Sequence, residues 1–270
     1  MKQSAKLRGK KIGLALSGGA ARGLAHIGVL EVLEREGIPI DMIAGSSAGA
    51  LVGVLYAQGK AVSEIKDLAI ELSSKRFSFW VDPTLPRSGL TRGRKIRNVL
   101  ASAIGDTEFG DLKLPFACVA ADIETGEEIV LNQGSVLEGV RASISIPIIF
   151  TVVKWKGRYL VDGSLVNPVP VSVVKEMGAD FIIAVNAIPD TSKKTYQPDK
   201  EPNIFNVIMH TVHIASHRLV EYSLSGADVV IEPQVASIGH FDFHRVQEFI
   251  LEGELAAQTS IPEIKQKLKV

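Results

Sequence analysis

Cysteine is nearly absent from this sequence, because Cys118 is the only one among 270 residues. A lone cysteine rules out an intramolecular disulfide and any metal cluster built from cysteines alone. Chains without disulfides are typical of reducing compartments, so we expect a cytoplasmic protein.

An excess of charge of either sign is also missing. Lys and Arg together number 30, Asp and Glu together number 30, and the formal net charge at pH 7 is +0. A general nucleic-acid binder normally carries a basic excess, so we expect no nucleic-acid partner, although a local basic patch is compatible with a zero sum. Hydrophobic residues make up 46% and charged residues 22% of the chain, which is typical of a globular protein and not of a disordered one.

Long hydrophobic runs are lacking as well. No stretch approaches the roughly 18 apolar residues that a membrane-spanning helix needs. Basic residues near the start precede the apolar stretch Ile12 to Leu16, which is shorter than the roughly 7 to 15 residues of a signal-peptide core. We therefore expect residues 1–10 to form a basic tail and residues 11–270 to form a single domain, since no linker divides them.

The sequence is rich in short apolar runs that alternate with longer helical patterns. This alternation is typical of βαβ units around a mainly parallel sheet, which indicates an α/β fold. The first two units pair the predicted strand Ile12 to Leu16 with a helix from Gly23 to Glu36, and the strand Asp41 to Ala44 with a helix from Ala48 to Gln58. Their connecting turns should lie together at the carboxyl edge of the sheet, where ligands bind in such folds.

The second of these turns contains a G-x-S-x-G motif. Its ends are Gly45 and Gly49, and its central residue is Ser47. Between a strand and a helix, small flanking residues permit a sharp turn that presents one hydroxyl at a helix N-terminus. We therefore expect Ser47 to be a nucleophile.

The first turn is a loop of small residues that allows two interpretations. With alanine in place of the middle glycine it resembles a dinucleotide-binding fingerprint, and Asp41 lies about 20 residues downstream, as that fold requires. Alternatively, its backbone N–H groups form an oxyanion hole beside Ser47. The second interpretation accounts for both turns, and it assigns the hole to Gly18, Gly19, Ala20, Ala21, Arg22 and Gly23.

Histidines and one aspartate are the candidate bases for Ser47. Asp162 ends an apolar strand and precedes a turn glycine, Gly163, so burial should raise its pKa toward useful basicity. The polar stretch around Asp242 offers histidines as the third member of a Ser, Asp, His order, and His26 is better explained as a packed neighbour of the oxyanion loop. Three histidines at helical spacing suggest a metal site, but a solvated helix face explains them better. The histidines near Asp242 are His240 and His244, and the three at helical spacing are His210, His213 and His217.

Three blocks together carry a family resemblance: Gly18 to Gly23, Gly45 to Gly49, and Asp162 to Ser164. Their order and context resemble those of the patatin-like phospholipases, which include plant patatins and the catalytic domain of neuropathy target esterase. The resemblance implies a three-layer α/β/α sandwich and a serine acyl hydrolase without metal or cofactor. It also implies a Ser47–Asp162 dyad, the Gly18 to Gly23 loop as oxyanion hole, and acyl lipids as substrates.

Two positions depart from the family pattern. Ala20 replaces the usual second glycine, which is tolerable if its backbone angles suit an L-residue, and Ser164 stands where glycine or alanine is usual. Outside the three blocks, residues 75–94 lose helical periodicity and mix aromatic with basic side chains. This segment is the best candidate for a mobile loop or lid. Its aromatic and basic residues are compatible with contact to an anionic membrane from the cytoplasmic side, but a solvated loop followed by a charged helix face explains them better.

Overall fold

A computed structural model describes residues 9–74, 93–190 and 204–269 of the chain. Most of the predicted basic tail and residues 75–92 of the predicted lid lie outside these ranges. The described residues contain one eight-stranded sheet with the order β5-β6-β3-β2-β1-β7-β8, and β4 pairs with β3 beside this path. The strands are β1 (Ile12–Leu16), β2 (Met42–Ser46), β3 (Phe116–Asp122), β4 (Glu128–Leu131), β5 (Val153–Trp155), β6 (Arg158–Asp162), β7 (Phe181–Val185) and β8 (Val229–Ile231).

The five strands from β3 to β8 along this path are parallel, whereas β4, β5 and β6 join by antiparallel pairing. Every residue of β1, β2, β3 and β7 is buried, because helices cover both faces of a parallel sheet. The unbroken apolar runs of the sequence are therefore strands buried on both sides.

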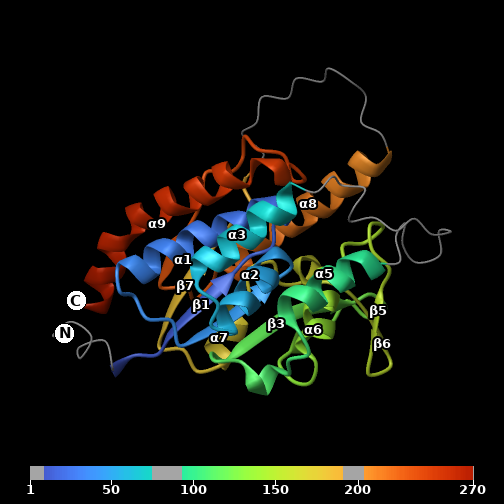
Figure 1. The fold of residues 1–270 in the computed structure, drawn as a ribbon, viewed down its shortest axis with the longest axis horizontal. Coiled ribbons are helices and arrows are strands. Elements are labelled where there is room, and N and C mark those ends of the chain that lie inside the picture. Colours follow the sequence, from blue (N-terminus) through green and yellow to red (C-terminus); the bar gives the residue numbers. More distant parts are fainter. Residues whose placement is uncertain (1–8, 75–92, 191–203, 270) are drawn as a thin grey trace.

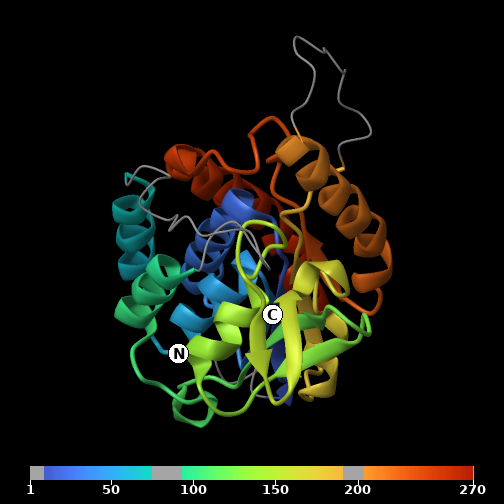
Figure 2. The same cartoon turned by 90° about the vertical axis from the view of Figure 1, so that its right-hand side faces the viewer.

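Helices form a layer on each face of this sheet (Figure 1). The larger layer packs on one hydrophobic core, and α7 with α8 packs on a second core across the sheet. Figure 2 shows the two layers on either side of the sheet, with the orange helix α8 at the right. In chain order the helices are α1 (Ala25–Arg35), α2 (Ala48–Ala57), α3 (Val62–Ser73), α5 (Arg94–Ile104), α6 (Val136–Ser143), α7 (Val171–Glu176), α8 (Ile204–Ser223) and α9 (Val246–Leu268).

The predicted α/β/α sandwich with a mainly parallel sheet is thus confirmed. The boundaries of the first two units differ slightly from the prediction. A 3₁₀ turn, Ala20–Leu24, precedes α1, and β2 continues to Ser46 because Gly45 and Ser46 pair with β3. Among the described helices, none combines the length and apolar character needed to cross a membrane.

Candidate active site

Ser47 occupies a sharp turn between β2 and α2. Its φ is 51°, in the left-handed region that non-glycine residues rarely adopt. The turn is crowded on both sides, since a Cβ on Gly45 would lie 2.5 Å from the Gly49 carbonyl oxygen and one on Gly49 would lie 2.2 Å from the Leu16 carbonyl oxygen. The two glycines therefore permit a turn that a side chain at either position would block.

Asp162 reaches Ser47 from a strand on the far side of β3. The register pairs Ser46 with Val119 of β3, and the adjacent residue Ala120 pairs with Asp162. The chain then passes over the Val119 carbonyl oxygen at Gly163, where a Cβ would lie 2.2 Å from that oxygen. This close approach lets the Ser47 hydroxyl donate a hydrogen bond of 2.5 Å to Asp162 Oδ2.

The Asp162 carboxyl group is almost completely enclosed, with 5% of the residue exposed. Burial raises its pKa from the ordinary value of 3.8 to about 6, because the ionised form loses water. Hydrogen bonds from Ser47 and Ser164 oppose this shift, and the Ser164 N–H lies 2.9 Å from Asp162 Oδ1. A carboxylate with a pKa near neutrality is a stronger base than an exposed one.

The glycine-rich loop leaves two backbone N–H groups beside Ser47. In this loop the N–H of Gly18 donates to Pro168, that of Ala21 to His240, and that of Arg22 to Gly19. Within the described part of the chain, no acceptor is found for the N–H groups of Gly19 and Ala20, and both residues line a cavity with Ser47.

Ala20 itself has a φ of 52°, so it does not meet the condition that its backbone angles suit an L-residue. Gly19 has a φ of 137°, where glycine is at ease. Gly23 packs against the elbow helix, since a Cβ there would lie 2.4 Å from that of Ala48. The loop thus holds an alanine in a strained conformation next to the nucleophile candidate.

Arg22 points its guanidinium at the segment before α9 and not at Ser47. Its Nε and Nη2 donate to the Ile238 carbonyl oxygen at 3.0 and 2.8 Å, and its Nη1 lies 2.9 Å from His240 Nε2. Burial lowers the pKa of Arg22 to about 10, with Asp242 opposing the shift, so the group stays charged at neutral pH. Arg22 was predicted as part of the oxyanion loop, but its side chain instead holds the neighbouring segment that contains Ile238 and His240.

The structure places no histidine between Ser47 and Asp162, which contact each other directly. His240 lies in the same cavity, where it contacts Arg22 and His213, and His244 is exposed. His26 is fully buried with Nε2 2.8 Å from the Ser17 carbonyl oxygen, and burial lowers its pKa to about 4, so it is neutral. The expectation that His26 is a packed neighbour agrees with this position.

The prediction of a solvated histidine face on α8 was wrong for His213. His210 is exposed, but His213 is half-buried and lines a cavity with Ser47 and Asp162. His217 is also half-buried and lies 3.5 Å from Asp190. Ser216, beside these histidines on the helix surface, is buried and Ala215 is exposed, so the histidine side of α8 faces the protein interior and not solvent. In the described ranges, no three His, Cys, Asp or Glu side chains gather as a metal site requires.

The dinucleotide interpretation is contradicted by the position of Asp41. Asp41 precedes β2, and its carboxylate accepts a hydrogen bond of 2.7 Å from the N–H of Ile12, the first residue of β1. It therefore lies at the amino edge of the sheet, about five residues or roughly 16 Å along the strands from the glycine-rich loop. A ribose-binding carboxylate would have to lie at the carboxyl edge.

Sequence reasoning missed the end of α6 as a support of the site. The buried Ser143 accepts a hydrogen bond of 3.0 Å from the Ser47 N–H, and the carbonyl oxygen of Ser145 accepts one of 3.0 Å from the Asp162 N–H. The other end of α6 is capped by Ser135, whose side chain accepts a hydrogen bond from the N–H of Glu138. Nothing in the local pattern indicates that the C-terminal end of this helix meets the elbow.

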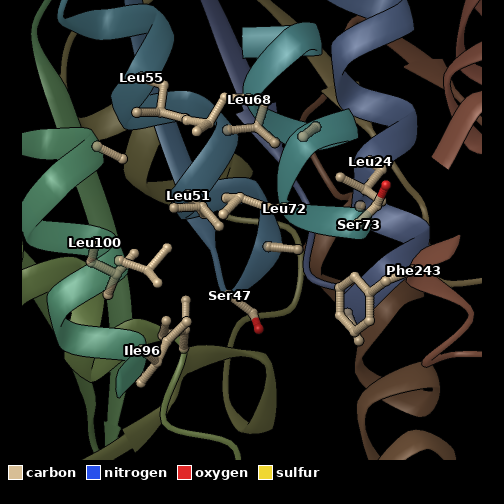
Figure 3. A pocket seen from close by; sticks show the side chains of 18 of the residues that line it. Leu24, Ser47, Leu51, Leu55, Leu68, Leu72, Ser73, Ile96, Leu100 and Phe243 are labelled. Carbon is tan, nitrogen blue, oxygen red and sulfur yellow. The ribbon is translucent and has the colours of Figure 1, made fainter. Parts of the chain in front are cut away.

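Two cavities meet at Ser47. The larger, of about 200 Å³, is apolar and lies between α2, α3 and α5; Figure 3 shows Ser47 at one end, with Leu51 and Leu55 farther along α2 and Leu68, Leu72 and Leu100 around them. The smaller, of about 70 Å³, contains Asp162, His213 and His240. Ala20, Ser47 and Ile146 line both cavities.

Sequence comparison gives matches that span most of this chain. A family model described as patatin-like phospholipase matches residues 14–175. An uncharacterized NTE family protein of Mycobacterium tuberculosis is 34% identical over 194 residues, which are 72% of this chain and 53% of that protein. Lysophospholipase NTE1 of Coccidioides immitis is 36% identical over 71% of this chain and 12% of its own length. The chain thus spans about half of the bacterial relative and a small part of the fungal one.

Comparison of folds agrees with the sequence matches. The crystal structure of VipD from Legionella pneumophila superimposes with a TM-score of 0.53 and 14% sequence identity, over 93% of this chain and 67% of that one. At this identity the likeness concerns the fold alone. The family model covers all three blocks of the predicted resemblance, which is thereby confirmed: the chain belongs to the patatin-like phospholipase family.

Proposed function

We propose that this protein is a serine acyl hydrolase that cleaves carboxylic esters of lipids through a Ser47–Asp162 dyad. The observation that carries the proposal is the direct 2.5 Å hydrogen bond between the Ser47 hydroxyl and a buried carboxylate with a raised pKa. A serine hydroxyl needs a base to become a nucleophile, and Asp162 is the group in contact with it.

In the first half of the reaction, Asp162 accepts the Ser47 proton while the Oγ atom attacks the ester carbonyl carbon. The carbonyl oxygen becomes an oxyanion, which the N–H groups of Gly19 and Ala20 stabilise. The bond to the alcohol oxygen then breaks, Asp162 returns the proton to that oxygen, and an acyl-enzyme remains. Ser143 contributes before the reaction starts, because its hydroxyl accepts a hydrogen bond from the Ser47 N–H and so holds the turn at Ser47 in position.

In the second half, water attacks the acyl carbon and gives its proton to Asp162. Collapse of the tetrahedral intermediate releases the carboxylic acid, and the proton returns from Asp162 to the Ser47 oxygen. The two halves use the same base and the same oxyanion donors, so one buried carboxylate serves both.

The larger cavity supports an acyl chain as the apolar part of the substrate. All but two of its lining residues are apolar or glycine, and the two serines include Ser47 itself. An acyl chain placed there would leave water as it binds, which stabilises the complex by about 0.8 kcal/mol per buried methylene group. Phospholipids, lysophospholipids and simple carboxylic esters all satisfy this requirement, and the name of the fungal relative supports the second of these.

Peripheral contact with an anionic membrane is part of the same proposal. Helix α5 supports it, because Ile96 and Leu100 line the apolar cavity while Arg94 and Lys95 are exposed on the other side. Arg97 is exposed as well, but it forms an ion pair with Glu138. Basic side chains beside the cavity would attract anionic headgroups by about 1 kcal/mol each. Flotation with anionic vesicles should carry the protein upward, and equal flotation with neutral vesicles would contradict this contact.

Substitution of the nucleophile tests the proposed activity. Ser47→Ala should abolish hydrolysis of p-nitrophenyl esters and labelling by a fluorophosphonate probe. Ser63→Ala, which removes an exposed serine of α3 that lines neither cavity, should keep both signals. Turnover retained by Ser47→Ala would disprove the assignment.

A further inference from the structure

Ser17 is a fully buried serine that directly follows β1 and precedes the glycine-rich loop. Its N–H donates a hydrogen bond of 3.0 Å to the Val185 carbonyl oxygen, which continues the pairing of β1 with β7 by one residue. Its hydroxyl group lies between two backbone groups, with Oγ 2.8 Å from the N of Ala187 and 2.9 Å from the Gly18 carbonyl oxygen. The proposed reaction gives this buried hydroxyl group no role.

The chemistry of these two neighbours fixes the direction of both hydrogen bonds. A backbone N–H group only donates, so Ser17 Oγ accepts from Ala187. A carbonyl oxygen only accepts, so the single hydrogen of the hydroxyl group is donated to Gly18. Because Ser17 is 0% exposed, water does not compete for either bond.

The Gly18 carbonyl belongs to the same peptide unit as the Gly19 N–H. That peptide bond is trans, so the carbonyl and the N–H point in opposite directions within one plane. A hydrogen bond that holds the carbonyl toward Ser17 therefore directs the N–H away from it. Gly19 lines the smaller cavity with Ser47, and its N–H is one of the two proposed oxyanion donors.

This peptide unit needs a device that holds it. It lies between two glycines, so no Cβ on either side opposes its rotation, and Gly19 has a φ of 137°. The second donor, the Ala20 N–H, is held differently, because the carbonyl of its peptide unit accepts a backbone hydrogen bond of 3.2 Å from Arg22. Of the two donors, only the Gly19 N–H thus depends on a side chain.

Ser17 is itself held from behind by α1. His26 Nε2 donates a hydrogen bond of 2.8 Å to the Ser17 carbonyl oxygen, and His26 is fully buried. The N–H, the carbonyl and the hydroxyl group of Ser17 are therefore all fixed by the fold. Donors that are oriented before the reaction stabilise a developing charge without any cost of reorganisation.

We propose that Ser17 is a positioning residue for the oxyanion hole, because its hydroxyl group holds the Gly18 carbonyl and thereby aims the Gly19 N–H at the developing oxyanion. The inference rests on the proposed hydrolase function and adds a residue that lines neither cavity. The effect of Ser17 on the rate therefore passes through the backbone of the loop.

The test compares p-nitrophenyl octanoate with its thiono analogue, in which sulfur replaces the carbonyl oxygen. Both release p-nitrophenol, but sulfur accepts hydrogen bonds weakly, so the thionoester gains little from an oxyanion hole. Ser17→Ala should lower kcat/KM about ten-fold for the ester and less than about two-fold for the thionoester, since one of two donors loses its orientation. The ratio of the two kcat/KM values therefore falls.

Two further variants complete the experiment. Ser17→Cys keeps a weak donor in nearly the same volume, so its ratio should lie between those of Ser17→Ala and wild type, and it decides the question if Ser17→Ala does not fold. Ser223→Ala removes another buried serine, at the end of α8, which lines neither cavity. This control should keep the wild-type kcat/KM for both substrates, and thermal melting shows that each variant is folded at the assay temperature.

The outcomes separate this inference from the proposed function. Equal losses for the ester and the thionoester would mean that Ser17 supports the fold around Ser47 and not an oxyanion donor, which overturns the inference. Wild-type values for both substrates in the Ser17 variants would overturn it as well, because the Gly19 N–H would then be held without the hydroxyl group. If the wild-type protein cleaves neither substrate, the proposed function fails first.

Discussion

The two cavities beside Ser47 are built in opposite ways. The larger is made mostly by three helices, α2, α3 and α5, whose inward apolar residues recur at helical spacing. The smaller gathers short pieces from seven parts of the chain, which include the glycine-rich loop, the elbow, the β6 turn and α8. An apolar surface can thus come from regular elements, whereas the smaller cavity, which contains Asp162, exists only where distant segments converge.

Ser47 lines both cavities, so a change in the dyad should affect every ester, however the ester occupies them. Asp162→Asn should lower kcat/KM about 10³-fold for every ester, whatever its acyl chain or alcohol, because the base for Ser47 is lost. Steady-state assays with a p-nitrophenyl ester and an alkyl ester of octanoic acid measure this effect. Asp41→Asn, at the amino edge of the sheet, is the matched control and should stay near wild type. A loss confined to one class of ester would show that Asp162 binds substrate instead of activating Ser47.

The depth of the apolar cavity can be probed at Leu55. This residue lies two helical turns beyond Ser47 on α2, about 12 Å along the helix axis. Leu55→Phe should fill the far end and lower kcat/KM for long-chain p-nitrophenyl esters about ten-fold, and Leu55→Ala should move the optimum toward longer chains. Leu55→Met conserves volume and should keep the wild-type chain-length profile. An unchanged profile in all three variants would place the acyl chain elsewhere.

Asp162, in the smaller cavity, should control the pH dependence of the reaction. Asp162 must be ionised to accept the Ser47 proton, so kcat/KM should fall as the pH drops below about 6. Ser164→Ala removes a hydroxyl group that stabilises the carboxylate, so the pKa of Asp162 rises and the midpoint moves to higher pH. Rate profiles from pH 4.5 to 8 of both proteins measure this shift. A midpoint that moves downward would contradict the assignment of the titrating group.

The same buried carboxylate should cost stability at high pH. Its pKa is about 6 in the folded protein against an ordinary value of 3.8, so the folded state holds an extra proton between these values and stability falls as the pH rises through them. Above pH 6, Asp162→Asn should therefore stabilise the fold by up to about 3 kcal/mol. Urea unfolding at pH 8 and pH 4.5 should show a larger difference from wild type at pH 8; an equal difference would mean that the charge has no energetic cost.

The smallest effect is expected at Ala20, in the wall common to both cavities. Its φ of 52° costs an L-residue about 1 kcal/mol, so Ala20→Gly should raise the melting temperature by about 2 °C. Ala21→Gly is the matched control, because Ala21 has no positive φ and glycine there should destabilise the fold by a similar amount. Equal destabilisation by both changes would indicate that Ala20 is not strained.

Local sequence predicted much of the candidate site. Apolar strands precede Ser47 and the glycine-rich loop, and another apolar strand ends at Asp162. Glycines lie in each of the three turns. These signals are local, because sharp turns need residues without a side chain wherever backbones approach closely. The sheet, its direction and the position of the elbow could therefore be predicted from the residues themselves.

The partners of these residues were decided by the tertiary structure. That Ser143 holds the elbow, that Arg22 turns toward Ile238, and that His213 faces a cavity depend on which segments pack together across the sheet. Periodicity shows that a helix has a polar face, but it does not show whether that face meets water or the protein interior. The sequence by itself determined the nucleophile candidate, its carboxylate and the parallel sheet, and only the packing of α8 and α6 against the sheet edge decided what surrounds them.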